Sequence, residues 1–107
     1  MNSKLLSLLG LCRRAGRLRL GFEQTLQAVE QRTAALILIA GDVAARTEKE
    51  VRFKAGDSVA IRRIAPTREQ LSHAVGAPAG TVTVTDEGFA KQALLLINQE
   101  ETTYDDD

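Results

Sequence analysis

The sequence contains no tryptophan, only one cysteine and two prolines, and aromatic residues make up 4% of its 107 positions. Its single cysteine, Cys12, excludes a disulfide framework and a cysteine-based zinc cluster. No apolar run approaches the roughly 20 residues that a membrane-spanning helix needs. Glycine-rich phosphate loops, Ser-His-Asp sets and metal-ligand motifs are also missing. We therefore expect a cytoplasmic protein with no cofactor, no metal, no membrane association and no catalytic activity.

Charge is unevenly distributed, although the 14 basic and 14 acidic residues cancel. The first 22 residues contain five bases and no acid, whereas the last eight contain five acids and no base. A solvated surface with a disordered acidic tail accounts for such a pattern. A basic stripe on a small domain also favours a polyanionic partner. RNA is one polyanion that fits this expectation.

The spacing of apolar residues predicts five helices that alternate with four strands. In the first helix, Leu5, Leu8, Leu9, Cys12 and Ala15 share one face. The second helix is expected to bury Phe22, Leu26 and Val29. The predicted helices span residues 3–15, 21–31, 47–56, 67–75 and 85 to about 98, and the predicted strands span 17–20, 35–40, 58–64 and 81–84.

Several polar residues are expected to cap these helices. Thr47 with Glu50 and Thr67 with Gln70 match the capping-box pattern. Thr85 is expected to cap the last helix.

Alternating helices and strands indicate the α/β class. We predict a single-domain three-layer α/β/α sandwich with a mixed central sheet of about four strands, in which the short first strand lies at an edge. The domain covers residues 1–99, and an acidic, disordered tail covers residues 100–107.

Several segments, in this order, are similar to the kink-turn-binding ribosomal-protein superfamily. They are a helix that starts at Gly21 and continues through 27–31, the strand and turn 36–43, the helix residues 67–71 and 74–76, and the strand 82–84. The runs 9–18 and 85–91 look especially like the bacterial YlxQ branch. The resemblance covers nearly the whole predicted core.

The resemblance implies that the start of the second helix contacts RNA. In the family this turn reads Gly-x-Asn-Glu-x-x-Lys, and its polar residues contact sheared G·A pairs and phosphates. Here Gly21 keeps the glycine, whereas Glu23, Gln24 and Gln27 stand at the Asn, Glu and Lys positions. Glu23 can only accept hydrogen bonds, and Gln27 lacks the cation. These departures do not favour tight kink-turn binding.

A second implied contact is the loop 76–80, which in relatives packs against a flipped-out base. Arginine side chains before Gly21 suit phosphates and base faces, and they can supply the missing positive charge. The predicted RNA-binding residues are Arg13, Arg14, Arg17, Arg19, Gly21, Glu23, Gln24, Gln27, Gln31, Ala77, Pro78 and Ala79.

The resemblance implies a structured RNA partner, ribosomal or translation-related, and no DNA partner. Ribosomal or translation proteins are further candidate partners. The alternative is a protein-interaction adaptor that keeps the fold and has lost specific kink-turn binding. Arg13 and Arg14 also complement a helix dipole, which is a sufficient structural reason for at least one of them. Arg46 and Lys49 fit either RNA contact or plain surface.

One pattern suggests an enzyme. Asp42 follows one strand and Asp86-Glu87 follow another, so carboxylates could cluster at one end of the sheet. An N-cap with acids in the first helical turn explains Asp86 and Glu87 better. His73 has no second metal-ligating partner nearby in the sequence.

Overall fold

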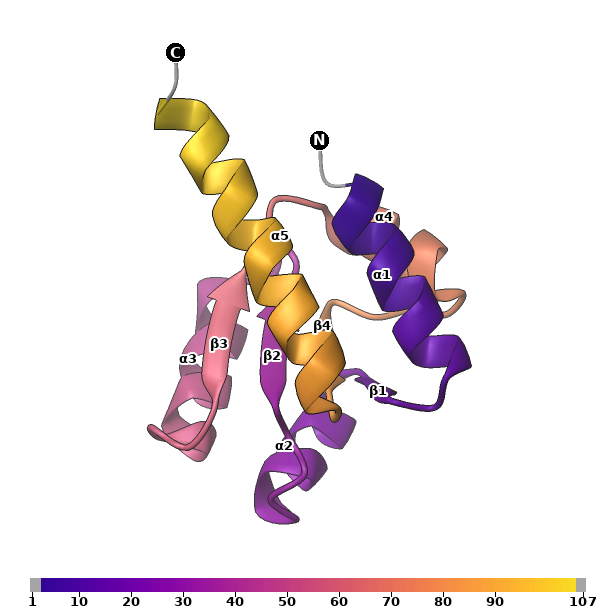
Figure 1. Cartoon of the computed structure of the whole chain (residues 1–107). Helices are drawn as coiled ribbons and strands as arrows, with labels where there is room; N and C mark the ends of the chain where they lie inside the picture. Colours follow the sequence, from indigo (N-terminus) through magenta and orange to yellow (C-terminus); the bar gives the residue numbers. More distant parts are fainter. Residues whose placement is uncertain (1–2, 106–107) are drawn as a thin grey trace.

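The computed structural model describes the backbone of residues 3–105 and the side chains of residues 4–99. Helices and strands alternate throughout, as the sequence predicts (Figure 1). The elements are α1 (Ser3–Arg14), β1 (Leu18–Leu20), α2 (Phe22–Glu30), β2 (Leu36–Ile39), α3 (Ala45–Ala55), β3 (Ala60–Arg63), α4 (Arg68–Val75), β4 (Thr81–Val84) and α5 (Glu87–Asp105). Within the described residues, no helix is both long and apolar enough to cross a membrane.

The four strands form one mixed sheet in the order β1-β4-β2-β3. Strand β4 is antiparallel to both of its neighbours, whereas β2 and β3 are parallel. Thr83 of β4 lies between Arg19 of β1 and Ile37 of β2. The mixed sheet and the edge position of β1 confirm the prediction.

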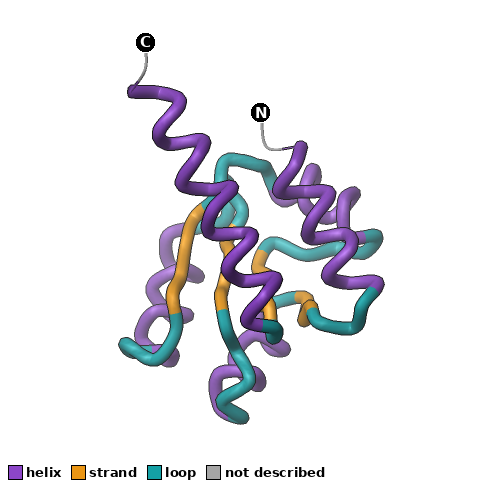
Figure 2. The backbone as a smooth tube through the Cα atoms, in the orientation of Figure 1, coloured by secondary structure: helices purple, strands orange, loops and turns teal. Residues whose placement is uncertain are grey.

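Helices cover both faces of this sheet (Figure 2). On one face, Leu36 and Leu38 belong to a core cluster with α1, α4 and α5. On the other face, Ile37 and Ile39 pack with α3 and with partly buried residues of α2. Alternate β2 side chains therefore reach separate cores, which explains why this strand is apolar throughout. The α/β/α sandwich is confirmed.

One polar contact lies between α2 and the sheet. The Thr83 hydroxyl donates to the Thr25 hydroxyl over 2.8 Å, and both side chains are fully buried. Thr25 and Ala28 are the buried residues of α2, whereas the apolar residues predicted for that face, Phe22, Leu26 and Val29, are only half-buried. The face of α2 that is turned towards the sheet is therefore centred on Thr25 and Ala28 rather than on the apolar residues.

The predicted N-cap of α3 is wrong. The helix begins at Ala45, two residues before Thr47, and its N-cap Ala44 makes no side-chain hydrogen bond. The amides of Thr47 and Glu48 already donate to the Ala44 carbonyl, so the first turn closes before Thr47 can act as a cap.

The predicted N-cap of α5 is also wrong. The Thr85 hydroxyl and amide both donate to the Arg17 carbonyl, at 3.1 and 2.9 Å, which prolongs the β1–β4 ladder. Asp86 therefore caps the helix, and its carboxylate accepts from the Phe89 amide at 2.8 Å.

The Thr67–Gln70 capping box of α4 is present, and the helix ends at Val75, as predicted; its C-cap Gly76 is left-handed. Ala15 is exposed and lies beyond the end of α1, and Leu8 is only half-buried. Helix α5 continues to Asp105 rather than ending near Asn98. Residues 106–107 lie outside the described part, and the division at residue 99 stays a prediction.

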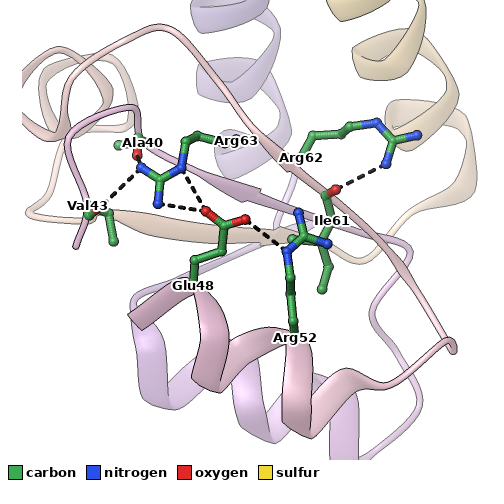
Figure 3. Close-up of polar contacts among 7 residues, drawn as sticks. All are labelled: Ala40, Val43, Glu48, Arg52, Ile61, Arg62 and Arg63. Atoms are coloured by element: carbon green, nitrogen blue, oxygen red, sulfur yellow. Dashed lines mark hydrogen bonds and ion pairs between the residues drawn. The ribbon is translucent and has the colours of Figure 1, made fainter. Parts of the chain in front are cut away.

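An arginine fixes the loop between β2 and α3 (Figure 3). The Arg63 guanidinium donates to the carbonyls of Ala40, Gly41 and Val43 at 3.1, 3.0 and 2.9 Å. Glu48 holds Arg63 in place at 2.6 Å and also pairs with Arg52 at 2.8 Å. The bonds from Arg52 and Arg63 lower the pKa of the Glu48 carboxyl.

We predict that Thr83→Val lowers the free energy of unfolding by about 1–3 kcal/mol, because it leaves the Thr25 hydroxyl buried without its donor. The double variant Thr25→Val/Thr83→Val removes both groups and is expected to recover most of that loss. Chemical denaturation of the single and double variants measures the difference. A double variant that loses the sum of the two single effects would show that the hydroxyls are not coupled.

A second stability prediction concerns Glu48. Its pKa is lower in the folded protein, so its contribution is present above the unfolded value of about 4.3 and is lost as the pH falls through the folded value. We expect Glu48→Gln to cost about 1 kcal/mol at pH 7 and progressively less in acid. Urea denaturation across this pH range measures it. The exposed Glu30 provides the control Glu30→Gln, and a Glu48→Gln effect independent of pH contradicts the account.

Candidate nucleic-acid interface

The junction between β1 and α2 is built on Gly21. Its φ of 92° and ψ of 167° lie in a region that only glycine adopts readily. The Gly21 amide donates to the Thr81 carbonyl at 2.7 Å, and its own carbonyl accepts from the Thr25 amide at 3.0 Å. These two bonds attach the start of α2 to the first residue of β4.

The N-terminus of α2 is open. Gly21 offers no side-chain cap, and within the described chain the amides of Phe22, Glu23 and Gln24 have no hydrogen-bond acceptor. An ideal Cβ at Gly21 would meet no atom within 4 Å. Free amides together with the positive end of the helix dipole suit a phosphate or another anion.

A cleft of about 530 Å³ lies in front of this helix end. Segments that are distant in the sequence form its walls. Gly80 allows them to meet, because a Cβ there would lie 2.9 Å from Cγ2 of Val43. The lining residues are Gly21, Phe22, Asp42, Val43, Ala44, Thr47, Glu50, Arg68, Pro78, Ala79, Gly80 and Thr81.

The predicted polar contacts of α2 divide into two groups. Glu23, Gln24 and Gln27 are exposed, and they line a second groove, between α2 and α3. Gln24 Oε1 accepts from the Leu20 amide at 3.1 Å, so this side chain also supports the turn before the helix. Gln31 is the C-cap, about 15 Å along the helix from Gly21. The structure therefore does not bring Gln31 to the cleft.

The loop between α4 and β4 contributes unequally. Pro78 is exposed and Ala77 is half-buried, but Ala79 is only 1% exposed. The Ser72 hydroxyl accepts from the Ala79 amide at 2.9 Å and donates to its carbonyl at 3.2 Å. Ala79 therefore anchors the loop, and Pro78 is the exposed loop residue that lines the cleft, whereas Ala77 does not line it.

The four arginines Arg13, Arg14, Arg17 and Arg19, here called the arginine stripe, differ in their partners. Arg13 donates to the Val75 carbonyl and so joins the end of α1 to the start of the loop. Arg19 donates to the carbonyls of Gly16 and Leu18 at 3.1 and 3.3 Å.

The other two arginines of the stripe are exposed, and their side chains bond to no described residue. Arg14 lines a groove between α1 and α4. Arg14 and Arg17 are therefore available to a ligand, whereas Arg13 and Arg19 also have structural roles.

Sequence reasoning missed Arg68 and the structural role of Asp42. Asp42 accepts from the Arg68 amide at 2.7 Å and so supports the start of α4, and both residues line the cleft. No local signal predicts a bond across 26 positions. Because β2 and β4 are antiparallel, Asp42 and Asp86 follow opposite ends of the sheet. The carboxylate cluster considered above does not form.

The single cysteine, Cys12, lies in the core. Burial raises the pKa of the Cys12 thiol to about 11, the Asp86 charge adds to this effect, and Arg19 opposes it. The Cys12 thiol is fully buried and donates to the Arg17 carbonyl at 3.3 Å, which fits the predicted packing role. Among the described residues, no three His, Cys, Asp or Glu side chains are grouped so as to hold a metal ion.

The sequence and the fold both resemble known proteins. The RNA-binding protein YlxQ of Enterococcus faecium is 29% identical over 94 residues, which cover 88% of this chain and 91% of that protein. A solved structure of a protein of unknown function from Bacillus halodurans has a TM-score of 0.82 and 32% identity, and the match covers 89% of this chain and 97% of that one. A 15.5 kD RNA-binding protein of Giardia lamblia has a TM-score of 0.69 at 17% identity, with 94% and 88% covered, and shares the fold.

These matches confirm the resemblance to the kink-turn-binding ribosomal proteins and to their YlxQ-like branch. The family's sequence profile extends over residues 3–94, from the first helix into the last. The chain belongs to the ribosomal protein L7Ae/L30e/S12e/Gadd45 family.

Proposed function

We propose that this protein is a non-catalytic, cytoplasmic RNA-binding protein that contacts structured ribosomal or translation-related RNA. One observation carries the proposal: the 2.7 Å bond from the Gly21 amide to the Thr81 carbonyl places the open end of α2 beside the α4–β4 loop. Both line the same cleft. The names of the Enterococcus faecium and Giardia lamblia relatives support RNA as the ligand.

Each wall of the cleft suits a different part of a nucleotide. The free amides of Phe22 and Glu23 can donate to a phosphate oxygen or a base acceptor. The exposed Pro78 offers an apolar surface for an unstacked base. Arg14 and Arg17 do not line the cleft, and their unpaired guanidinium groups can contact phosphates of the same RNA outside it.

The carboxylate of Glu23 and the neutral amide of Gln27 limit this interface. Glu23 accepts from base amino groups but repels phosphate, and Gln27 provides no charge. We propose that the open end of α2 and the loop beside it still favour kinked RNA over an unbent duplex. Because of Glu23 and Gln27, we expect the affinity to be modest and to depend strongly on the arginine stripe and on salt.

Titration of the wild-type protein with a kink-turn duplex, an unbent duplex and a single strand, each at two salt concentrations, tests this proposal. We expect the kink-turn duplex to bind most tightly and the affinity to fall with salt as counterions are released. Equal, salt-steep binding of all three RNAs would reject the kink preference. No binding to any RNA at low salt would reject RNA binding itself and favour the protein-interaction adaptor.

The neutral side chain at position 27 predicts a substitution that strengthens RNA binding, whereas most substitutions in a binding site weaken it. Gln27→Lys adds a cation on the exposed face of α2 and is expected to tighten kink-turn binding by about 1–3 kcal/mol. Gln92 is also exposed but lies on α5, across the sheet, so Gln92→Lys is the matched control for added charge. If both variants tighten binding to the same extent, position 27 does not contact the RNA.

A further inference from the structure

An exposed aromatic side chain stands on α3, outside the cleft. Phe53 is 85% exposed, compared with 50% for Leu11 and 55% for Leu95. Val51 and Ala55 of the same helix are buried in the core. At about 100° per residue, Phe53 is turned about 160° from each of these neighbours and points away from the protein. Nothing in its packing explains a phenylalanine here.

Two cations share the outer face of α3 with this ring. Arg46, Lys49 and Phe53 have the i, i+3, i+7 spacing of residues on one face of a helix. Among the side chains that the structure describes, neither Arg46 nor Lys49 has an ion pair or a hydrogen bond. Lys54 and the carboxylate of Glu50 lie beside these three residues, on the side of α3 that faces α2. The outer face therefore keeps a positive balance.

The remaining charges of α3 are neutralised on its other side. Glu48 pairs with Arg52 and with Arg63 of β3, at 2.8 and 2.6 Å (Figure 3). This ion-pair network draws the Glu48 carboxylate towards the sheet and away from Arg46 and Lys49.

The face of α3 that carries Arg46, Lys49 and Phe53 adjoins the proposed RNA cleft. Thr47 and Glu50 of α3 line that cleft. Phe53 lies about 9 Å along the helix axis from Thr47 and about 4.5 Å from Glu50. A strand that leaves the cleft along α3 therefore meets Arg46 and Lys49 first and the Phe53 ring next.

We propose that Arg46, Lys49 and Phe53 form a stacking ridge that binds a single-stranded segment of the RNA held in the cleft. Phe53 stacks on an unpaired base, and the two cations contact the phosphates between that base and the cleft. This inference rests on the proposed RNA-binding function and extends its site to a second helix. A ring set among charged side chains, without an apolar patch around it, fits a nucleic acid better than the apolar centre of a protein interface.

The test compares a blunt kink-turn duplex with the same duplex carrying single-stranded oligouridine extensions. We expect Phe53→Ala to weaken binding of the extended RNA by about 5- to 150-fold, which corresponds to the loss of one stacked base, and to leave the blunt duplex unaffected. Arg46→Gln/Lys49→Gln is expected to weaken the extended RNA and to reduce the dependence of its affinity on salt. Leu95→Ala removes another exposed apolar side chain, on α5, and serves as the control.

Because the chain contains no tryptophan, Phe53→Trp provides a direct signal for stacking. We expect this variant to bind the extended RNA at least as tightly as the wild type, and its indole fluorescence to be quenched on binding. The control Leu95→Trp is expected to show no quenching.

The outcomes separate this inference from the proposed function. If the wild-type protein binds both RNAs equally, or if Phe53→Ala leaves both affinities unchanged, the stacking ridge is rejected while the cleft stands. If Phe53→Ala weakens both RNAs equally, the ring does not act on a single strand and the ridge is rejected as stated. If the wild-type protein binds neither RNA, the proposed function fails and the ridge fails with it.

Discussion

Strand β4 hydrogen-bonds to β1 on one side and to β2 on the other, although it is the last strand of the chain. This pairing determines which segments meet at the candidate interface. Because β4 begins beside the end of β1, the loop that precedes it is held next to the start of α2. The amide of Gly21 completes the contact by donating to Thr81 at the first position of β4. The cleft is therefore a consequence of strand order rather than of any local motif.

Three further sets of contacts hold the segments around the cleft in position. The buried hydrogen bond between Thr25 and Thr83 attaches α2 to strand β4. Arg13 binds the carbonyl at the end of α4, and Arg63 binds three carbonyls of the loop that leads into α3. Each contact satisfies main-chain or buried polar groups, so the loops around the cleft are ordered before any ligand arrives. Preorganised loops of this kind suit the recognition of an RNA by its folded shape.

The alternation of apolar runs was enough to predict the element order and the three layers, because each element carries its own periodicity. Local signals also predicted the Thr67–Gln70 box. Sequence reasoning failed where distant groups decide the outcome. The carbonyl of Arg17 holds Thr85 in the ladder and leaves the cap to Asp86. At the candidate site, the resemblance pointed to Gly21, which lines the cleft. Only the structure shows that Gln31 lies far from the cleft, that Ala79 is buried and that Arg68 also lines the cleft.

The central claim is that the start of α2 and the α4–β4 loop form one RNA-contact surface. Amide chemical shifts of isotopically labelled protein, followed during titration with a kink-turn duplex, test it most directly. The account predicts that the amides of residues 21–24 and of the loop residues 77 and 80 shift together along one binding curve, while those in the first turns of α5 stay unchanged. Shifts confined to the groove between α1 and α4, or separate curves for the two segments, would contradict it.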